Sequence, residues 1–297
     1  MDAPPHCPVQ SLRLTVLVEN TSPGGGLVAE HGLALLLETE RGTVLFDTGA
    51  TPAVLAANAA ALGSDLTRVS AIVLSHGHYD HTGGLPTVLA AAPSARVYYH
   101  WRCTAPRWGQ RWWVRKAVGM PAESRRALES AAREPVAGSR LLPEGVILSG
   151  PIPGPPAAAQ KGFLADSDTG PRPDDFADEL FLLAHTPSGW LLVTGCCHRG
   201  VENTLAYAQQ LNGGEAVGIV VGGLHLKRVS RSALGAAAAA LDAAGTREVW
   251  AGHCTGGKAI AHLAKRLRGR VETLYTGLAL PQGPSGASPR GSKARCY

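Results

Sequence analysis

The chain has 297 residues, 45% of them hydrophobic, so it can bury a sizeable core as one large domain or as one domain with an insertion. No apolar run reaches the ~20 residues that span a bilayer, and the first ten residues lack the basic and apolar regions of a signal peptide. The six cysteines are scattered rather than framed as a disulfide scaffold. We therefore expect a cytoplasmic protein.

The net charge of +5 is concentrated in two segments. Residues 101–140 carry nine Lys and Arg against three Glu, a net charge of +6. The last segment, 281–297, adds three basic residues and no acid, so the rest of the chain is net acidic. The basic residues form no recognised nucleic-acid-binding module, so we expect neither a nucleic acid nor a membrane as partner.

Strands and helices alternate along the first hundred residues. We predict helices at 52–62 and 85–92, and strands at 12–19, 32–39, 43–47, 69–74 and 95–99. The two strands around Glu40-Arg41-Gly42 have the spacing of a hairpin. This mixed alternation predicts sheets that are covered by helices.

Residues 101–175 interrupt the alternation. They are rich in Trp, Arg, Pro and Gly and hold four of the six tryptophans. We interpret them as an insertion of short helices that packs over the functional site of a domain spanning residues 1–280. After the insertion we predict helices at 202–211, 232–244 and 257–267, and strands at 180–185, 190–194, 216–222 and 248–251. The tail, 281–297, is rich in Gly, Pro and Ser and is predicted to be disordered.

The most informative stretch is SHGHYDHTGGL, residues 75–85, which directly follows the apolar run at 69–74. Such a run before a Gly/His/Asp-rich turn predicts a buried strand that ends in a loop. Imidazoles and a carboxylate crowded at a strand end usually bind a divalent metal, although four solvated loop residues are the alternative. We favour a metal site formed by His76, His78, Asp80 and His81. The spacing lets the first two face one ion and the last two a second.

This His-x-His-x-Asp-His run resembles the signature of the metallo-β-lactamase superfamily, and the resemblance extends from residue 12 to residue 280. It implies an α/β (α+β) fold, a four-layer αββα sandwich, with two zinc ions as cofactors. The flavodiiron branch of the family typically has Glu where this chain has His78, so zinc-type hydrolytic chemistry is favoured, with iron or manganese as alternatives. The segments VLVEN, LFDTG, TGCCHRGVENT, GGLHL and GHCTG resemble the dihydropteroate-synthase-like subfamily. That subfamily is named for a dihydropterin-ribofuranosylaminobenzene-phosphate synthase.

The resemblance implies further ligands at later strand ends: a middle His, a bridging Asp and a last His. His253, in AGHCTGG, fits the last position, with an ordinary loop histidine as the alternative. Cys196 stands where many relatives have Asp, and thiolate is a sound zinc ligand. Most free cysteines are small buried hydrophobes, so that role stays open for Cys196. His198, two residues on, is the candidate for the middle His.

Other polar residues are expected to support these ligands. The resemblance suggests that Asp47, in LFDTG, hydrogen-bonds the histidines of the metal loop, and that His31 has a similar but weaker role. Asp178 is expected near the Cys196 end of its hairpin, where the alternative is a solvated loop residue. His225, in GGLHL, ends a strand at the same edge and is a candidate proton donor to a leaving group.

Bound divalent metal lowers the pKa of water from about 15.7 to about 7. This chemistry supports hydrolysis of an ester, thioester, lactone, amide or phosphodiester, with Asp80 orienting the water and His225 protonating the leaving group. The Arg/Trp-rich segment suggests an anionic or aromatic small-molecule substrate held by Arg102, Trp112 and Arg115. Alternatively, these side chains fill and solvate the insertion itself.

Three classes of function remain open. A metallohydrolase needs metal and a water-accessible site. A pterin-type transferase would bind a diphosphate leaving group while an arylamine attacks a pterin methyl carbon. A non-catalytic metal-binding protein would keep the ligands without turnover, and the intact first loop argues against it.

Overall fold

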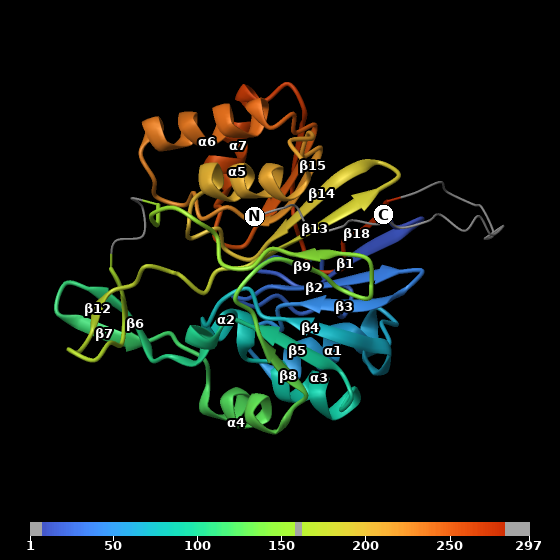
Figure 1. Ribbon diagram of the computed structural model, residues 1–297, viewed down its shortest axis with the longest axis vertical. Helices are drawn as coiled ribbons and strands as arrows, with labels where there is room; N and C mark the ends of the chain where they lie inside the picture. The colour runs from blue at the N-terminus through green and yellow to red at the C-terminus, as the bar shows by residue number, and fades with distance from the viewer. Residues whose placement is uncertain (1–7, 158–161, 283–297) are drawn as a thin grey trace.

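Four layers, in the order helices, sheet, sheet, helices, make up the structure, a computed structural model that describes residues 8–157 and 162–282 (Figure 1). The first sheet has the strand order β18 (Ala279–Gln282), β1 (Leu12–Val18), β2 (Ala34–Thr39), β3 (Gly42–Phe46), β4 (Val69–Val73), β5 (Arg96–Tyr99) and β8 (Arg133–Pro135). The second has the order β17 (Arg270–Thr273), β16 (Glu248–Gly252), β15 (Ile219–Gly223), β14 (Gly189–Thr194), β13 (Phe181–Thr186), β10 (Ile147–Leu148) and β9 (Arg140–Leu141). This is the predicted αββα sandwich.

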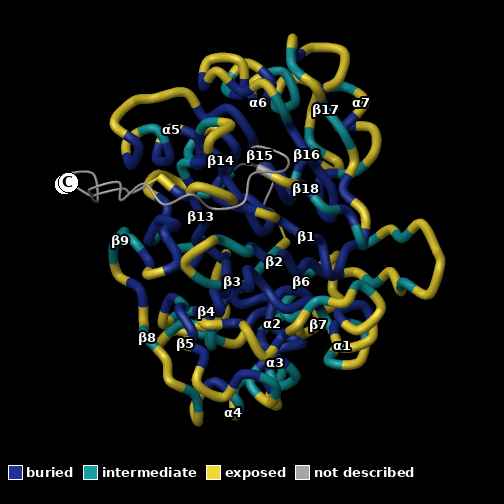
Figure 2. Tube along the Cα trace, turned by 90° about the vertical axis from the view of Figure 1, so that its right-hand side faces the viewer, coloured by how far each residue is buried: buried dark blue, intermediate teal, exposed yellow. Residues whose placement is uncertain are grey.

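Alternating apolar side chains hold the layers together. In β13, Leu182 and Ala184 enter the core between the two sheets. Phe181 and Leu183 on the same strand face the outer layer formed by α5 (Val201–Leu211), α6 (Arg231–Ala243) and α7 (Gly257–Arg266). The first sheet packs in the same way against α1 (Pro52–Ala61), α3 (Leu85–Ala91) and α4 (Ala122–Ser130). Strands buried on both faces explain why their sequences are continuously apolar, and Figure 2 shows the buried trace running through both sheets.

The parallel strands bring the candidate residues to one edge of the sandwich. β3 and β4 are parallel in the first sheet, and β14, β15 and β16 are parallel in the second. The loops after these strands carry the predicted ligands, and several of their residues have positive φ: Asp47 (60°), Cys197 (66°), His225 (46°) and His253 (52°). Non-glycine residues adopt this conformation rarely, and it concentrates at functional sites.

The segment 101–175 contains short helices, at Trp101–Thr104 and in α4, but it also forms strands that were not predicted. A small third sheet, with the order β12 (Arg172–Pro173), β11 (Phe163–Ala165), β6 (Arg107–Arg111) and β7 (Val114–Ala117), projects beside the sandwich (Figure 1). The rest of the segment joins the main layers, because β8, β9 and β10 extend the two large sheets. The β6–β7 hairpin could not be predicted from the sequence, because the two residues of its turn are Trp112 and Trp113. Glycine or asparagine usually marks such a turn.

The predicted boundary of the C-terminal tail differs from the structure. Residues 281 and 282 belong to β18, which pairs with β1, so the predicted disordered tail cannot begin at 281. The remaining residues of that tail, 283–297, lie outside the described residues. No helix within the described part of the chain is long and apolar enough to cross a membrane.

Candidate metal centre

The first group of potential ligands consists of His76, His78 and His198. One ring nitrogen of each lies within 4.8 Å of the others, and all three side chains are buried. The Nε2 atom of His76 is 3.0 Å from Nδ1 of His78. The Nε2 atom of His78 is buried without a hydrogen-bond partner in the described structure. Nδ1 of His78 faces Nε2 of His76 and is therefore the nitrogen of His78 that is placed to bind a metal together with His76.

The second group consists of Asp80, His253 and His31. Oδ2 of Asp80 lies 3.4 Å from Nε2 of His253 and 3.2 Å from Nε2 of His31. The rings of His31 and His253 stack with centroids 5.0 Å apart. His81 reaches the same place, with its Nε2 3.1 Å from Nε2 of His253. His81 also lies near the first group, because its ligand nitrogen is within 4.8 Å of that of His76.

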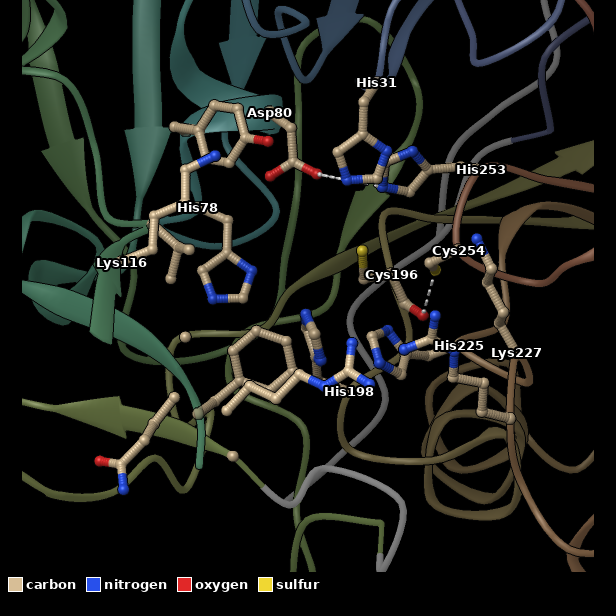
Figure 3. A pocket seen from close by; sticks show the side chains of 18 of the residues that line it. His31, His78, Asp80, Lys116, Cys196, His198, His225, Lys227, His253 and Cys254 are labelled. Atoms are coloured by element: carbon tan, nitrogen blue, oxygen red, sulfur yellow. Dashed lines mark hydrogen bonds and ion pairs between the residues drawn. The ribbon is translucent and has the colours of Figure 1, made fainter. Parts of the chain in front are cut away.

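Cys196 lies between the two groups (Figure 3). Its Sγ is 3.2 Å from Nε2 of His81, and its ligand atom also lies within 4.8 Å of a ring nitrogen of His76. The neighbouring Cys197 turns away into the core beneath α5. The thiol of Cys196 therefore lies near ring nitrogens of both His76 and His81.

A third group, Cys196, His225 and Cys254, adjoins the first two. Cys254 lies within the candidate metal motif AGHCTGG but was not among the predicted ligands. Burial opposes ionisation of Cys254, but hydrogen bonds from Cys196 and His225 outweigh it and lower the pKa of this thiol. Burial alone would lower the pKa of His225, but the hydrogen bond with Cys254 outweighs burial, so the pKa of this histidine is raised.

Asp47 fixes the first loop through three contacts. One carboxylate oxygen accepts a hydrogen bond from the Ser75 amide at 2.7 Å, and the other contacts Ser75 Oγ at 2.7 Å and His81 Nδ1 at 2.6 Å. The last contact leaves Nε2 of His81 facing the site. Such a carboxylate–histidine pair orients the ring and makes it more basic.

Asp178 supports the same loop from the other side. Its Oδ2 accepts a hydrogen bond from the Gly77 amide, between the first two histidines, at 2.8 Å. Its Oδ1 lies 2.8 Å from Nη2 of Arg107, whose Nε bonds Asp174 at 2.7 Å. All three charged side chains are almost fully buried. The small third sheet is thus tied to the metal loop by a buried ion triad.

Two buried glutamates, Glu179 and Glu19, hold the loops of the later candidate ligands. Glu179 accepts hydrogen bonds from the backbone amides of His198 and Arg199, both at 2.6 Å. Glu19 accepts one from the amide of His253 at 2.5 Å. In addition, Phe176 stacks on the His198 ring with centroids 4.0 Å apart. The pairing of Glu19 with His253 spans 234 positions of sequence, so no local pattern could reveal it.

The ionisable side chains of the first loop have pKa values shifted in opposite directions. Burial lowers the pKa of His78 to about 3, which keeps this ring neutral and able to bind metal. Burial acts in the same direction on His81, but the carboxylates of Asp47 and Asp80 outweigh it and raise its pKa to about 9. Burial disfavours ionised Asp80 as well, yet His81 and His253 hold the pKa of this carboxyl well below its usual range.

A cavity of about 710 Å³ opens above these groups. Its wall includes Phe163, with Arg111 and Lys116 from the β6–β7 hairpin and Lys227 and Arg228 from the loop after His225. Asp80 is the one acidic side chain among the described residues that line it. Figure 3 shows Lys116 and Lys227 on opposite sides.

The predicted substrate contacts do not line this cavity. Arg102 forms an ion pair with Asp175, and Trp112 is 73% exposed at the turn of the hairpin. Arg115 donates from Nε to Gln110. Side chains alternate along a strand, so Val114 and Lys116 face the cavity while Arg115 between them faces away.

Comparisons with known proteins agree with this geometry. A family model described as the metallo-beta-lactamase superfamily matches residues 27–190. An uncharacterized protein of Methanocaldococcus jannaschii, MJ0448, is 30% identical over 85% of this chain and 94% of its own length. The 7,8-dihydropterin-6-methyl-4-(beta-D-ribofuranosyl)-aminobenzene-5'-phosphate synthase of the same organism is 26% identical over 84% and 89%.

A solved structure shows the same similarity in three dimensions. Tm1679, described as a metal-dependent hydrolase of the beta-lactamase superfamily, superimposes with a TM-score of 0.77. It is 28% identical, over 91% of this chain and 98% of its own. With the family model spanning the metal loop, the chain belongs to the metallo-β-lactamase superfamily.

Proposed function

We propose that this protein is a metal-dependent hydrolase that cleaves an ester, amide or phosphoester bond of a small molecule. The observation that carries the proposal is the convergence of imidazole, carboxylate and thiol groups on the floor of a cavity large enough for such a substrate. Bound divalent metal supplies hydroxide at neutral pH and stabilises the developing negative charge.

The donor set favours two zinc ions. His76, His78 and His198 would hold one ion, and Asp80, His81 and His253 the other, with Cys196 between them. Zinc accepts this mixture of nitrogen, oxygen and sulfur donors, whereas manganese prefers oxygen ligands and iron remains the redox alternative.

Two side chains would act on the reacting atoms. The depressed pKa of Asp80 keeps its carboxylate ionised, so it can accept a hydrogen bond from the attacking water and orient it. His225 lines the cavity, and its raised pKa favours the protonated ring that donates to a leaving group. Asp47 and Asp178 would act by positioning the metal loop.

The cavity wall favours an anionic, aromatic substrate. Arg111 and Lys116 on one side and Lys227 and Arg228 on the other can contact phosphate or carboxylate groups. Phe163 offers an aromatic face between the cations and the histidines, with its ring 5.5 Å from that of His198.

A transferase is the second candidate, because one relative is named as a dihydropterin–aminobenzene-phosphate synthase. The same cationic cavity would bind a diphosphate leaving group. The two functions differ in their need for an arylamine: a transferase turns over only when that acceptor is present.

The test compares the zinc-loaded wild type with Asp80→Ala on bis(p-nitrophenyl) phosphate and p-nitrophenyl acetate. We expect hydrolysis by the wild type and a loss of at least about 100-fold in the variant, with an unchanged circular dichroism spectrum. Asp242→Ala, on the exposed face of α6, is the control and should retain the wild-type rate. Equal rates in Asp80→Ala and wild type would exclude the role given to Asp80.

A further inference from the structure

Cys196 and Cys254 come from loops that follow strands separated by another strand. Cys196 follows β14 and Cys254 follows β16, and β15 runs between them in the same sheet. Nevertheless, Sγ of Cys254 lies 3.4 Å from the carbonyl oxygen of Cys196, and the two Sγ atoms lie within 4.8 Å of one another. Both residues line the cavity, so a small solute can reach them (Figure 3).

A glycine at the end of the intervening strand permits this approach. At Gly223, an added Cβ would lie 2.3 Å from the carbonyl oxygen of Gly195, 2.8 Å from Sγ of Cys254 and 3.3 Å from Cα of Cys196. Any other residue at this position would place its side chain between the two cysteines. The absence of a side chain at Gly223 therefore leaves room for Sγ of Cys254 beside the backbone of Cys196.

The other described cysteines are placed differently. Cys197 belongs to the core under α5, where its Sγ contacts Thr204 at 3.2 Å. Cys103 is buried in the core between the first sheet and its helices. Of the described cysteines, Cys196 and Cys254 thus combine mutual contact with access to the cavity.

We propose that Cys196 and Cys254 form a reversible dithiol–disulfide pair beside the metal centre. Hydrogen peroxide oxidises one thiol to a sulfenic acid and is itself reduced, releasing one water. The second thiol then attacks that sulfur, so that the S–S bond forms and the hydroxyl leaves with a proton as a second water. Two thiols and one peroxide thereby give one disulfide and two waters, and a dithiol reductant reverses the change.

The disulfide would switch the site off. Sγ of Cys196 contacts Nε2 of His81 in the reduced chain, and a bond to Cys254 removes this sulfur as a donor to metal. This consequence rests on the proposed function, because it assumes that Cys196 contributes to metal binding. The formation of the disulfide itself does not depend on that assumption.

The first experiment maps the bond in the full-length chain. Metal is removed with a chelator, the protein is treated briefly with hydrogen peroxide, free thiols are blocked with N-ethylmaleimide, and tryptic peptides are analysed by mass spectrometry. We expect a peptide pair that joins Cys196 to Cys254 and disappears after dithiothreitol. The pair should persist in Cys197→Ser and be absent in Cys254→Ser. Peroxide treatment that leaves these residues unlinked, or links Cys196 to Cys103 or Cys197, would overturn the proposal.

The second experiment measures zinc uptake by the reduced, oxidised and re-reduced chain. Reduced protein should bind zinc, oxidised protein should bind fewer ions, and dithiothreitol should restore uptake. Unchanged uptake by the linked protein would overturn the switch. A reduced chain that binds no zinc but still forms the link would support the dithiol pair while contradicting the proposed function.

Discussion

Two histidines of the first loop, three positions apart, differ in charge because their neighbours differ. Burial lowers the pKa of His78 to about 3, whereas His81 has a pKa of about 9 because Asp47 and Asp80 outweigh the effect of burial. In the metal-free protein at pH 7, His78 is therefore neutral and His81 carries a proton. Zinc must displace that proton from His81, while His78 is ready to bind.

This difference predicts the pH dependence of metal binding. Zinc affinity should rise at least about tenfold per pH unit between pH 7 and 9, because binding releases the proton of His81. Competition with a chromophoric chelator measures the slope. Asp47→Asn removes the contact that raises the pKa of His81, so its slope should be shallower by about one proton. A wild-type affinity that does not change over this pH range would contradict the argument.

At the scale of residues, the sequence reveals ligands but not the groups that hold them. His76, His78, Asp80 and His81 stand in one short run, and that run predicts a metal site by itself. Cys254 and Glu179 carry no such pattern. Their partners lie in other segments and meet them only after the sheets have formed.

At the scale of elements, the small third sheet is held to the metal loop by a buried charge network. Arg107 on β6 lies between Asp174 and Asp178, and Asp178 binds the loop at Gly77. Removing one partner of such a network leaves uncompensated buried charge, which is strongly destabilising.

Arg107→Met should therefore lower the free energy of unfolding by about 3–5 kcal/mol. Arg115→Ala, at an exposed position of the adjacent strand, is the matched control and should change it by less than about 0.5 kcal/mol. Guanidinium denaturation of the metal-free proteins measures both. Equal stabilities of the two variants would show that the ion pairs of Arg107 with Asp174 and Asp178 do not stabilise the fold.

Alternation along β7 makes a separate prediction about the substrate wall. Lys116→Gln should raise the inhibition constant of pyrophosphate about fivefold, the equivalent of about 1 kcal/mol from a solvated charge. Arg115→Gln should leave it unchanged, because Arg115 faces away from the cavity. Steady-state inhibition of the zinc-loaded enzyme distinguishes the two. An equal effect of both substitutions would indicate general charge attraction rather than a contact.

The elements of the sandwich could be predicted because continuous apolar strands and helical periodicity are local signals. The third sheet could not, since a Trp-Trp turn gives no hairpin signal and composition alone suggested helices. Composition also pointed to Arg115, whereas its neighbour Lys116 is the residue that lines the cavity.

At the scale of the whole molecule, each half of the sandwich is incomplete by itself. The first sheet supplies His76, His78, Asp80 and His81, and the second supplies Cys196, His198 and His253. The centre exists where the ends of their parallel strands meet. Metal binding should thus join the two halves and stabilise the fold as a unit.

Metal content tests the central claim most directly. Tag-free protein, purified under reducing conditions and supplemented with zinc before gel filtration, would be analysed by inductively coupled plasma mass spectrometry. The account predicts about two zinc ions per chain, one for each ligand group. Protein that retains no metal under these conditions, while folded by circular dichroism, would contradict the metal centre and the hydrolase built on it.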